Sequence, residues 1–356
     1  MFSRGGSLPT AKGASTERAI PTYSATAESN RVRKKRQEAI MAGELAVVLS
    51  GGGAKGAFQV GVLDELITNR GVKVDIAVGT STGSIQALAV AQDDIPKLLQ
   101  MWLGLKGSSD IYSKKPLGIV GGAIGADSIY EARGLKKLLK QNANDAKLRS
   151  TGKKLRLGVV NLGTGEFRSI DERTPGIHNW VYASCAMPVF FDPLTTSDGG
   201  QWVDGGVRDV TPLGTALELN PRGVIVVRAG AKPRPAAPKS YENLIEIGLR
   251  AVDILQKEVS ANDLANAALI NDLIAAREAQ LRALQGANVD PVSMTAVLRP
   301  LDVKLAEYRF APIRVIEPEK DYLDTLKFDP ARIREAIEGG RQAVEREWHA
   351  IEPLLT

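Results

Sequence analysis

Two strand–turn–helix units follow one another without interruption, and they constrain the fold more than any other feature of the sequence. The apolar run 45–49 predicts a buried strand, which the glycines at 51–53 end. Apolar residues then recur at helical spacing over 57–67. Residues 73–78 predict a second strand, and a turn at 79–83 joins it directly to another apolar helix. Repeated units of this kind predict a parallel sheet with helices on its faces.

The remaining sequence predicts further elements, separated by less regular stretches. Helices are expected at 95–105, 128–139, 176–187, 241–286 and 330–350, and strands at 155–162, 166–170, 224–227 and 312–316. Glycine-rich residues 116–126 and proline-rich residues 231–240 predict loops. The chain has 356 residues, which is enough to bury a sizeable core. We expect one domain over 44–350, with a helical region at 241–310 inside it.

Residues 1–43 differ from the rest of the chain in composition and charge. They are rich in Ser, Thr, Ala and Gly, lack periodicity, and predict a disordered basic tail. Eight basic and three acidic residues lie there, so this segment carries the whole net charge of +5. The remaining body is neutral overall and gives no reason to expect a nucleic-acid partner. The basic run 31–36 could contact an anionic membrane, and a solvated tail is the simpler interpretation.

Several classes of protein are excluded by what the sequence lacks. One cysteine, Cys185, excludes an internal disulfide and a multi-cysteine zinc site. Only two histidines are present, His178 and His349, which makes a histidine-rich metal site unexpected. We expect neither a metal nor a cofactor. No segment predicts a membrane span, and residues 1–43 lack the apolar core of a signal peptide. We therefore expect a cytoplasmic protein, peripheral to the membrane at most, with Met41 as an alternative start.

The strongest chemical signal is Gly79-Thr80-Ser81-Thr82-Gly83, between a predicted strand and a predicted helix. A serine on such a sharp turn projects its hydroxyl from the edge of the sheet, and the turn requires small neighbours. The N–H groups and positive dipole of the following helix suit a developing negative charge. The pattern predicts Ser81 as a nucleophile and the N–H of Thr82 as an oxyanion donor.

A second glycine-rich loop, Gly51-Gly52-Gly53-Ala54-Lys55-Gly56, also joins a strand to a helix. Gly51, Gly53 and Gly56 match the dinucleotide-binding pattern, with Asp75 as the acidic residue that should follow. A Walker A loop is excluded because no Gly-Lys-Ser/Thr sequence occurs. The N–H groups of the loop also suit an oxyanion. We favour this second role, because a nucleotide fold does not require a serine turn after the next strand.

The third signal is Val203-Asp204-Gly205-Gly206, for which a simple turn is the ordinary interpretation. A serine nucleophile needs a base, and a carboxylate held near Ser81 by this turn would supply one. Histidine is the usual base, but His178 and His349 are expected to have structural or surface roles.

These three stretches, in this order, resemble the patatin-like phospholipase family of the bacterial type. Three further stretches are similar to the family: residues 161–166, residues 328–340, and residues 183–188 continuing to Phe190, Phe191 and Pro193. The likeness covers about 45–345, and within it 241–310 match the family only in helical character.

The resemblance implies a three-layer α/β/α fold with a mostly parallel central sheet. It also implies a Ser–Asp dyad in place of a triad, with Ser81 as nucleophile and Asp204 as proton acceptor. Gly52, Gly53 and Thr82 would supply oxyanion N–H groups, and Lys55 would support their loop. Cys185 would be a buried small hydrophobic residue. The activity implied is hydrolysis of fatty-acyl esters, with phospholipids or lysophospholipids as substrates and an acyl-enzyme as intermediate.

Two alternatives stay open from the sequence. A general carboxylesterase or neutral-lipid lipase of the same fold would use the same residues and differ in chain-length and headgroup preference. A nucleotide-binding module would use residues 51–56 and would bind nucleotide without any esterase activity.

Overall fold

The computed structural model describes residues 43–115, 128–232 and 240–355. Its strands are β1 (Leu45–Leu49), β2 (Ile76–Thr80), β3 (Ser113–Lys114), β4 (Tyr130–Glu131), β5 (Lys154–Asn161), β6 (Phe167–Asp171), β7 (Leu194–Thr195), β8 (Gln201–Asp204), β9 (Gly223–Val227) and β10 (Ile313–Ile316). An eight-stranded sheet has the order β10-β9-β1-β2-β5-β8-β7, with β6 paired to β5 beside this path. Neighbours from β10 to β5 run parallel, and β6, β7 and β8 pair antiparallel.

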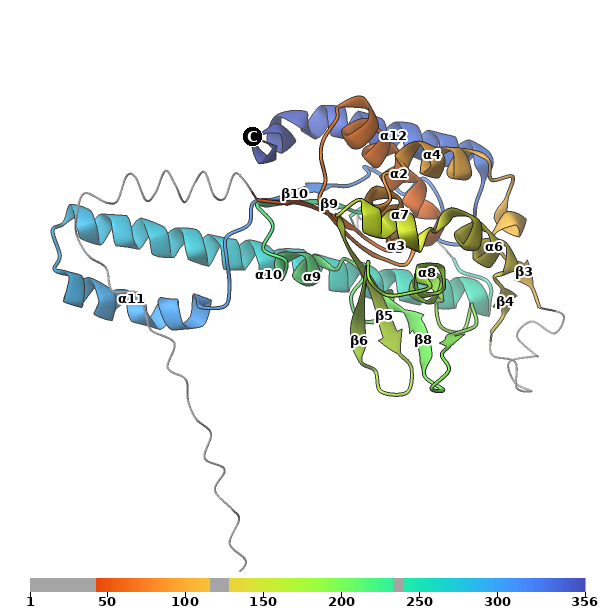
Figure 1. Cartoon of the computed structure of the whole chain (residues 1–356), viewed down its shortest axis with the longest axis horizontal. Helices are drawn as coiled ribbons and strands as arrows, with labels where there is room; N and C mark the ends of the chain where they lie inside the picture. The colour runs from red at the N-terminus through yellow and green to blue at the C-terminus, as the bar shows by residue number, and fades with distance from the viewer. Residues whose placement is uncertain (1–42, 116–127, 233–239, 356) are drawn as a thin grey trace, which may run out of the picture.

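Helices cover both faces of this sheet (Figure 1). The α-helices are α2 (Ala57–Leu63), α3 (Thr82–Ala91), α4 (Ile95–Leu103), α6 (Arg133–Asn142), α7 (Asp145–Ser150), α8 (Ile177–Cys185), α9 (Leu213–Leu217), α10 (Leu244–Gly286), α11 (Pro291–Leu305) and α12 (Pro330–Ile351). Shorter helical turns are η1 (Gly53–Gly56), η2 (Asp64–Asn69), η3 (Ser108–Asp110), η4 (Gly205–Val207) and η5 (Glu352–Leu354). Helices α2, α4 and α12 lie on one face, and α9 and α10 lie on the other. The expected three-layer α/β/α class with a mostly parallel sheet is therefore confirmed.

Strand β1 illustrates why the apolar runs of this sequence become central strands. Leu45, Val47 and Leu49 belong to the core on the α2 and α12 side. Ala46 and Val48 belong to the smaller core on the α9 and α10 side. A strand that is buried on both faces has no position for a polar side chain, so its sequence is continuously apolar.

Most of the predicted elements are present among the described residues, with shifted ends. The strand expected at 73–78 lies at Ile76–Thr80, so Gly79 belongs to the strand itself. Strand β8 and helix α9 have no counterpart among the predicted elements, and α11 lies inside the helical region expected at 241–310. The expected loop at 116–126, most of the tail at 1–43 and most of the stretch at 231–240 lie outside the described residues. The division into a tail and one domain stays a prediction.

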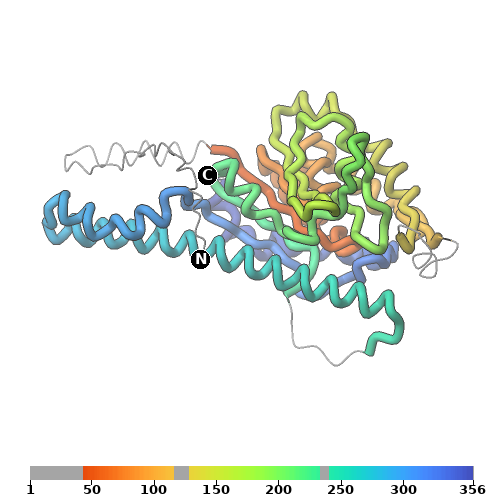
Figure 2. Tube along the Cα trace, turned by 90° about the horizontal axis from the view of Figure 1, so that it is seen from below, coloured from red at the N-terminus to blue at the C-terminus, as the bar shows by residue number. Residues whose placement is uncertain are grey.

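Helices α10 and α11 form a hairpin whose far end extends beyond the sheet (Figure 2). Met294 and Leu298 of α11 are buried, and Arg277 of α10 forms an ion pair of 2.7 Å with Asp302. Despite its length, α10 is not apolar enough to span a membrane, and neither is any other helix of the described residues.

Helices α2 and α12 cross in direct backbone contact because each has a glycine at the crossing. A Cβ atom on Gly340 would lie 2.2 Å from the carbonyl oxygen of Phe58. A Cβ atom on Gly61 would lie 1.8 Å from the carbonyl oxygen of Ile337. Both distances are far below van der Waals contact, so a larger residue would force the helices apart.

This crossing predicts a difference between two helical glycines. Gly340→Ala should lower the free energy of unfolding by about 2–3 kcal/mol, because the added methyl overpacks the crossing. Gly248→Ala in α10 is the matched control, since its Cβ would meet no atom within 4 Å. That change should raise the free energy of unfolding by about 0.5–1 kcal/mol through helix propensity. Urea denaturation of both variants checks the prediction, and equal stability of the two would contradict it.

Candidate active site

Ser81 occupies a sharp turn between β2 and α3. Its backbone has φ 55° and ψ −130°, a left-handed conformation that costs a residue with a side chain about 1–3 kcal/mol. The N–H of Ser81 donates to the hydroxyl of Ser184 at 3.0 Å, and Ser184 in turn donates to the carbonyl of Gly158 at 2.7 Å. The hydroxyl of Ser84 donates to the carbonyl of Ser81 at 2.6 Å. These bonds hold the strained residue in place from both of its peptide groups.

The two glycines of this turn are required by close backbone contacts. A Cβ on Gly79 would lie 2.2 Å from the carbonyl oxygen of Gly83. A Cβ on Gly83 would lie 2.1 Å from the carbonyl oxygen of Leu49, at the end of β1. The first turn of α3 therefore packs against both parallel strands, which places Ser81 beside the loop that follows β1.

Asp204 ends β8, where it pairs with Val159 of β5, and its side chain is buried. The N–H of Gly206 donates to its carboxylate at 2.7 Å. Burial raises the pKa of Asp204 to about 7, against the smaller opposing effects of the Ser81 hydroxyl and the Gly206 N–H. The carboxyl group is thus close enough to Ser81 to interact with it, and its ionisation falls near neutral pH.

Backbone N–H groups from two segments lie beside Ser81: the glycine-rich loop after β1 and the first turn of α3. Gly52 and Gly53 line the same pocket as Ser81, and among the described residues their N–H groups have no acceptor. The N–H of Gly51 donates to the carbonyl of Val210 at 2.9 Å. This N–H is therefore not free to bind an oxyanion, and its bond holds the loop in place. Thr82 is the first residue of α3, where N–H groups lack partners within the helix.

Lys55 anchors the glycine-rich loop through ion pairs with two other segments. Its ammonium group lies 2.7 Å from Asp253 of α10 and 3.1 Å from Asp321. Lys257 of α10 lies 3.1 Å from the same Asp321 carboxylate. Burial lowers the pKa of Lys55, and the two carboxylates outweigh that effect and raise it. The charge of Lys55 is therefore used to tie the loop to α10 and does not face the pocket as a free cation.

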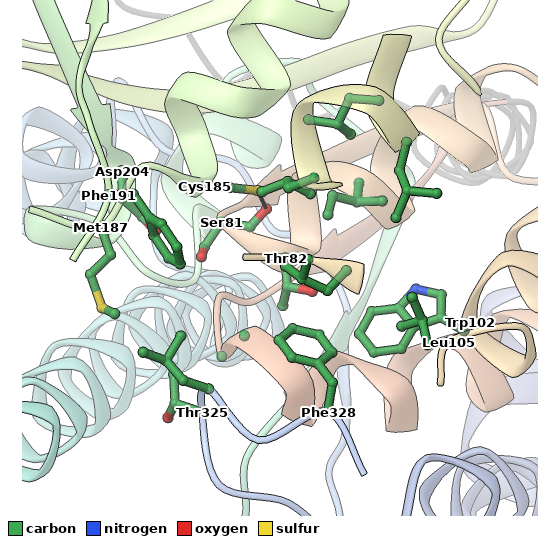
Figure 3. A pocket seen from close by; sticks show the side chains of 18 of the residues that line it. Ser81, Thr82, Trp102, Leu105, Cys185, Met187, Phe191, Asp204, Thr325 and Phe328 are labelled. Carbon is green, nitrogen blue, oxygen red and sulfur yellow. Dashed lines mark hydrogen bonds between the residues drawn. The ribbon is translucent and has the colours of Figure 1, made fainter. Parts of the chain in front are cut away.

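A long apolar pocket lies beside Ser81. Its volume is about 820 Å³, including the open space at its mouth. Figure 3 shows Ser81, Met187, Thr325 and Phe328 around its hollow, with Trp102 and Leu105 farther along. Most of its lining is apolar, from α4, α6 and the segment before α12: Met101, Trp102, Leu105, Leu135, Leu138, Leu139, Leu326 and Phe328. Such a pocket suits an aliphatic chain whose reacting end lies at Ser81.

The structure gathers the predicted site residues and leaves both histidines outside. Ser81, Thr82 and Asp204 line the pocket together with the two glycines of the loop. His178 lies on α8 and His349 near the end of α12, and neither lines this pocket in the part of the chain that is described. Of the described residues, no group of three His, Cys, Asp or Glu is arranged to hold a metal ion.

Several residues of the site were not predicted. Gln256 of α10 and Thr325 line the pocket from distant parts of the chain, and no local pattern marks them. Ser184 belongs to the 183–188 stretch that is similar to the family, and nothing in that stretch indicates its bond to Ser81. Cys185 is buried, which raises the pKa of its thiol, and its Sγ lies 3.1 Å from the carbonyl of Ser81.

A serine on a strand-to-helix turn, beside free N–H groups and a buried carboxylate, is an arrangement typical of α/β serine hydrolases. Residues 47–217, just under half of the chain, match the family model described as patatin-like phospholipase. The resemblance predicted from the sequence is therefore confirmed.

Two curated relatives are similar over part of their length. The uncharacterized protein YjjU of Escherichia coli (strain K12) is 26% identical over 207 residues, or 57% of this chain and 56% of that protein. A protein of Pseudomonas aeruginosa (strain BWHPSA011 / Pa011), named cGAMP-activated phospholipase, is 29% identical over 182 residues. That match covers 47% of this chain and 53% of the relative, so this chain spans about half the length of both relatives.

Among solved structures, VipD from Legionella pneumophila is similar at 17% sequence identity, with a TM-score of 0.41. The match covers 86% of this chain and 67% of VipD.

The Lys55 cluster predicts a stability difference between two lysines. Lys55→Met removes the buried cation between Asp253 and Asp321 and leaves Lys257 to pair with both, so it should lower the free energy of unfolding by about 2–3 kcal/mol. Lys327→Met is the control, because Lys327 and Asp324 form an exposed ion pair at 3.7 Å. That change should stay within about 0.5 kcal/mol of the wild type. Urea denaturation measures both, and a Lys55→Met protein as stable as the control would show that the cluster contributes little.

Proposed function

We propose that this protein is a lipid acyl hydrolase that cleaves fatty-acyl esters through an acyl-enzyme on Ser81. The observation that carries the proposal is the position of the Ser81 hydroxyl, next to a buried carboxylate and at the end of an apolar pocket. The match of residues 47–217 to the patatin-like phospholipase family supports the same class of substrate.

The proposed chemistry uses Asp204 as the only base. In acylation, Asp204 accepts the proton of the Ser81 hydroxyl while Oγ attacks the ester carbonyl carbon. The carbonyl oxygen becomes an oxyanion, which the N–H groups of Gly52, Gly53 and Thr82 stabilise. When the tetrahedral intermediate collapses, the bond to the leaving alcohol breaks and Asp204 returns its proton to that oxygen. In deacylation, Asp204 accepts a proton from water while the water oxygen attacks the acyl carbonyl carbon. The bond to Ser81 Oγ then breaks, Asp204 returns the proton to Oγ, and the fatty acid is released. No step requires a metal or a cofactor.

The substrate that we propose is a glycerophospholipid or lysophospholipid. The apolar side chains of α4 and α6 would hold the acyl chain, while the polar part of the lipid stays near the pocket mouth. One relative that is named a phospholipase is similar to about half of this chain. We propose a cytoplasmic enzyme that reaches its substrate at a membrane surface, and the single free cysteine is consistent with a reducing compartment.

Substitutions at the dyad test this mechanism directly. Ser81→Ala should abolish both hydrolysis and labelling by a fluorophosphonate probe. Asp204→Asn should be nearly inactive, because the amide keeps the shape but cannot accept the proton. The double variant His178→Asn/His349→Gln should stay within about tenfold of wild type, since neither histidine takes part. Release of fatty acid from a mixed phospholipid extract, followed by mass spectrometry, measures all four proteins.

The controls separate the proposal from its alternatives. Circular dichroism of each variant confirms folding, so that a loss of activity reports chemistry. A folded double-histidine variant as inactive as Ser81→Ala, with turnover retained by Asp204→Asn, would overturn the dyad. Hydrolysis of simple or neutral-lipid esters with no release from phospholipids would make the protein a general carboxylesterase or lipase.

The raised pKa of Asp204 predicts the pH dependence of the reaction. The carboxyl group must be ionised to accept a proton, and burial raises its pKa to about 7. The kcat/KM for a neutral, soluble ester should therefore rise about tenfold per pH unit below about pH 7, and level off above it. Initial rates between about pH 5 and pH 9 measure this profile. A flat profile below pH 7 would show that the base of the reaction ionises at a lower pH.

A further inference from the structure

The first turns of α10 present two faces of opposite character. One face carries Asp253 and Lys257, which form the ion pairs around Lys55, and Gln256, which lines the pocket. The opposite face carries Leu244, Ile247, Ala251, Ile254 and Leu255, which recur at helical spacing. We call these five residues the apolar face of α10.

The apolar face is exposed to solvent. Leu244 is 67% exposed, Ile247 52%, Ile254 52% and Leu255 66%. Arg250, three residues after Ile247 and four before Ile254, borders this face, whereas Glu246 and Asp253 lie on other sides of the helix. Single exposed apolar residues are common, but four large ones along one stripe indicate a surface that contacts another apolar phase. Figure 2 shows this end of α10 at the edge of the molecule.

The apolar face and a residue of the pocket rim belong to the same segment of α10. Gln256, on the next turn, lines the pocket, and a Cβ on Gly206 would lie 2.9 Å from its Nε2 atom. Val207, which follows Gly206 and is only three residues from Asp204, is 54% exposed. Helix α10 therefore connects the exposed apolar stripe to the groups around Ser81.

We propose that the apolar face of α10 docks on the surface of a phospholipid bilayer, with the helix lying in the interface beside the pocket. This inference rests on the proposed function, because it names the phase from which the substrate is taken. A helix that inserts an apolar stripe between headgroups binds more tightly the more apolar area it buries, and it needs no partner surface of matching shape. The net charge of +5 on residues 1–43 adds attraction to anionic lipid in the same encounter.

A second copy of the chain is a poorer fit to this face. From Leu244 to Leu255 the helix rises about 17 Å, at about 1.5 Å per residue. With a width near 10 Å, the stripe offers roughly 170 Å², whereas a stable protein interface buries about 800 Å² on each partner. A bilayer is therefore the occupant that the size of the face favours.

Charge substitutions on α10 test the proposal in the full-length protein. Ile247→Glu/Leu255→Glu should bind phosphatidylcholine vesicles at least about tenfold more weakly than wild type. Leu269→Glu/Leu273→Glu is the matched control, because these exposed leucines lie on the same helix farther from the pocket. The control should bind vesicles as wild type does. Assays at about 0.5 M salt screen the tail, so that they measure the apolar contact alone.

A fluorescence measurement keeps the test independent of those variants. Cys185 is buried, so an environment-sensitive thiol probe would label an introduced Ile254→Cys selectively. Its emission should shift to the blue and brighten when phosphatidylcholine vesicles are added, whereas the same probe at Leu269→Cys should not respond. Equal responses at both positions, or unchanged vesicle binding by the Ile247/Leu255 variant, would overturn the proposal.

Two further readouts distinguish the possible failures. Turnover of a soluble short-chain ester should be the same in wild type and in both glutamate variants, because none of these residues lines the pocket. If the wild type hydrolyses no ester while the vesicle-binding difference persists, the proposed function fails and the docking face stands. If light scattering shows a wild-type dimer that the Ile247/Leu255 variant dissociates, with vesicle binding unchanged, the face is a protein interface and the proposal is wrong.

Discussion

The two glycines on either side of Ser81 impose the constraint on which the whole site depends. Because neither Gly79 nor Gly83 has room for a Cβ, β2 can continue into α3 only where the chain nearly touches itself and β1. That close approach puts Ser81 into a left-handed conformation, which the bonds from Ser84 and to Ser184 maintain. It also sets the end of β2 beside the end of β1. The serine and the glycine-rich loop are neighbours because the carboxyl ends of parallel strands share one edge of the sheet.

For the proposed Ser–Asp dyad, burial would make the Asp204 carboxylate a stronger base. An aspartate in water has a pKa of about 3.9 and is a weak base for a serine hydroxyl. Enclosed at the end of β8, Asp204 has a pKa of about 7, close to the ordinary value for histidine of about 6.5. In the mechanism that we propose, this carboxylate would be a base of histidine-like strength. This explains why a chain with both histidines outside the pocket still has a candidate base in it.

The parts that could be predicted from the sequence are those where local chemistry decides the structure. The buried strands, the turn at Ser81 and the glycine-rich loop follow from apolar runs and from small residues at fixed spacing. Strand β8 was missed because only four residues form it and its Asp-Gly-Gly ending has the composition of a turn. The contributions of Gln256 and Thr325 were missed for a different reason. They reach the pocket only through the tertiary packing of α10 and of the segment before α12, and short sequence patterns do not record such contacts.

The length of α10 provides an attachment point that is far from Ser81. From Gln256 at the pocket to Gly286 at the end of the helix is thirty residues, which corresponds to about 45 Å along the axis. A dye, affinity tag or surface tether attached to the short turn between α10 and α11 would therefore sit far from Ser81. Tethered through that turn, the protein would keep the end that holds Ser81 free to meet a droplet, a micelle or a supported lipid film.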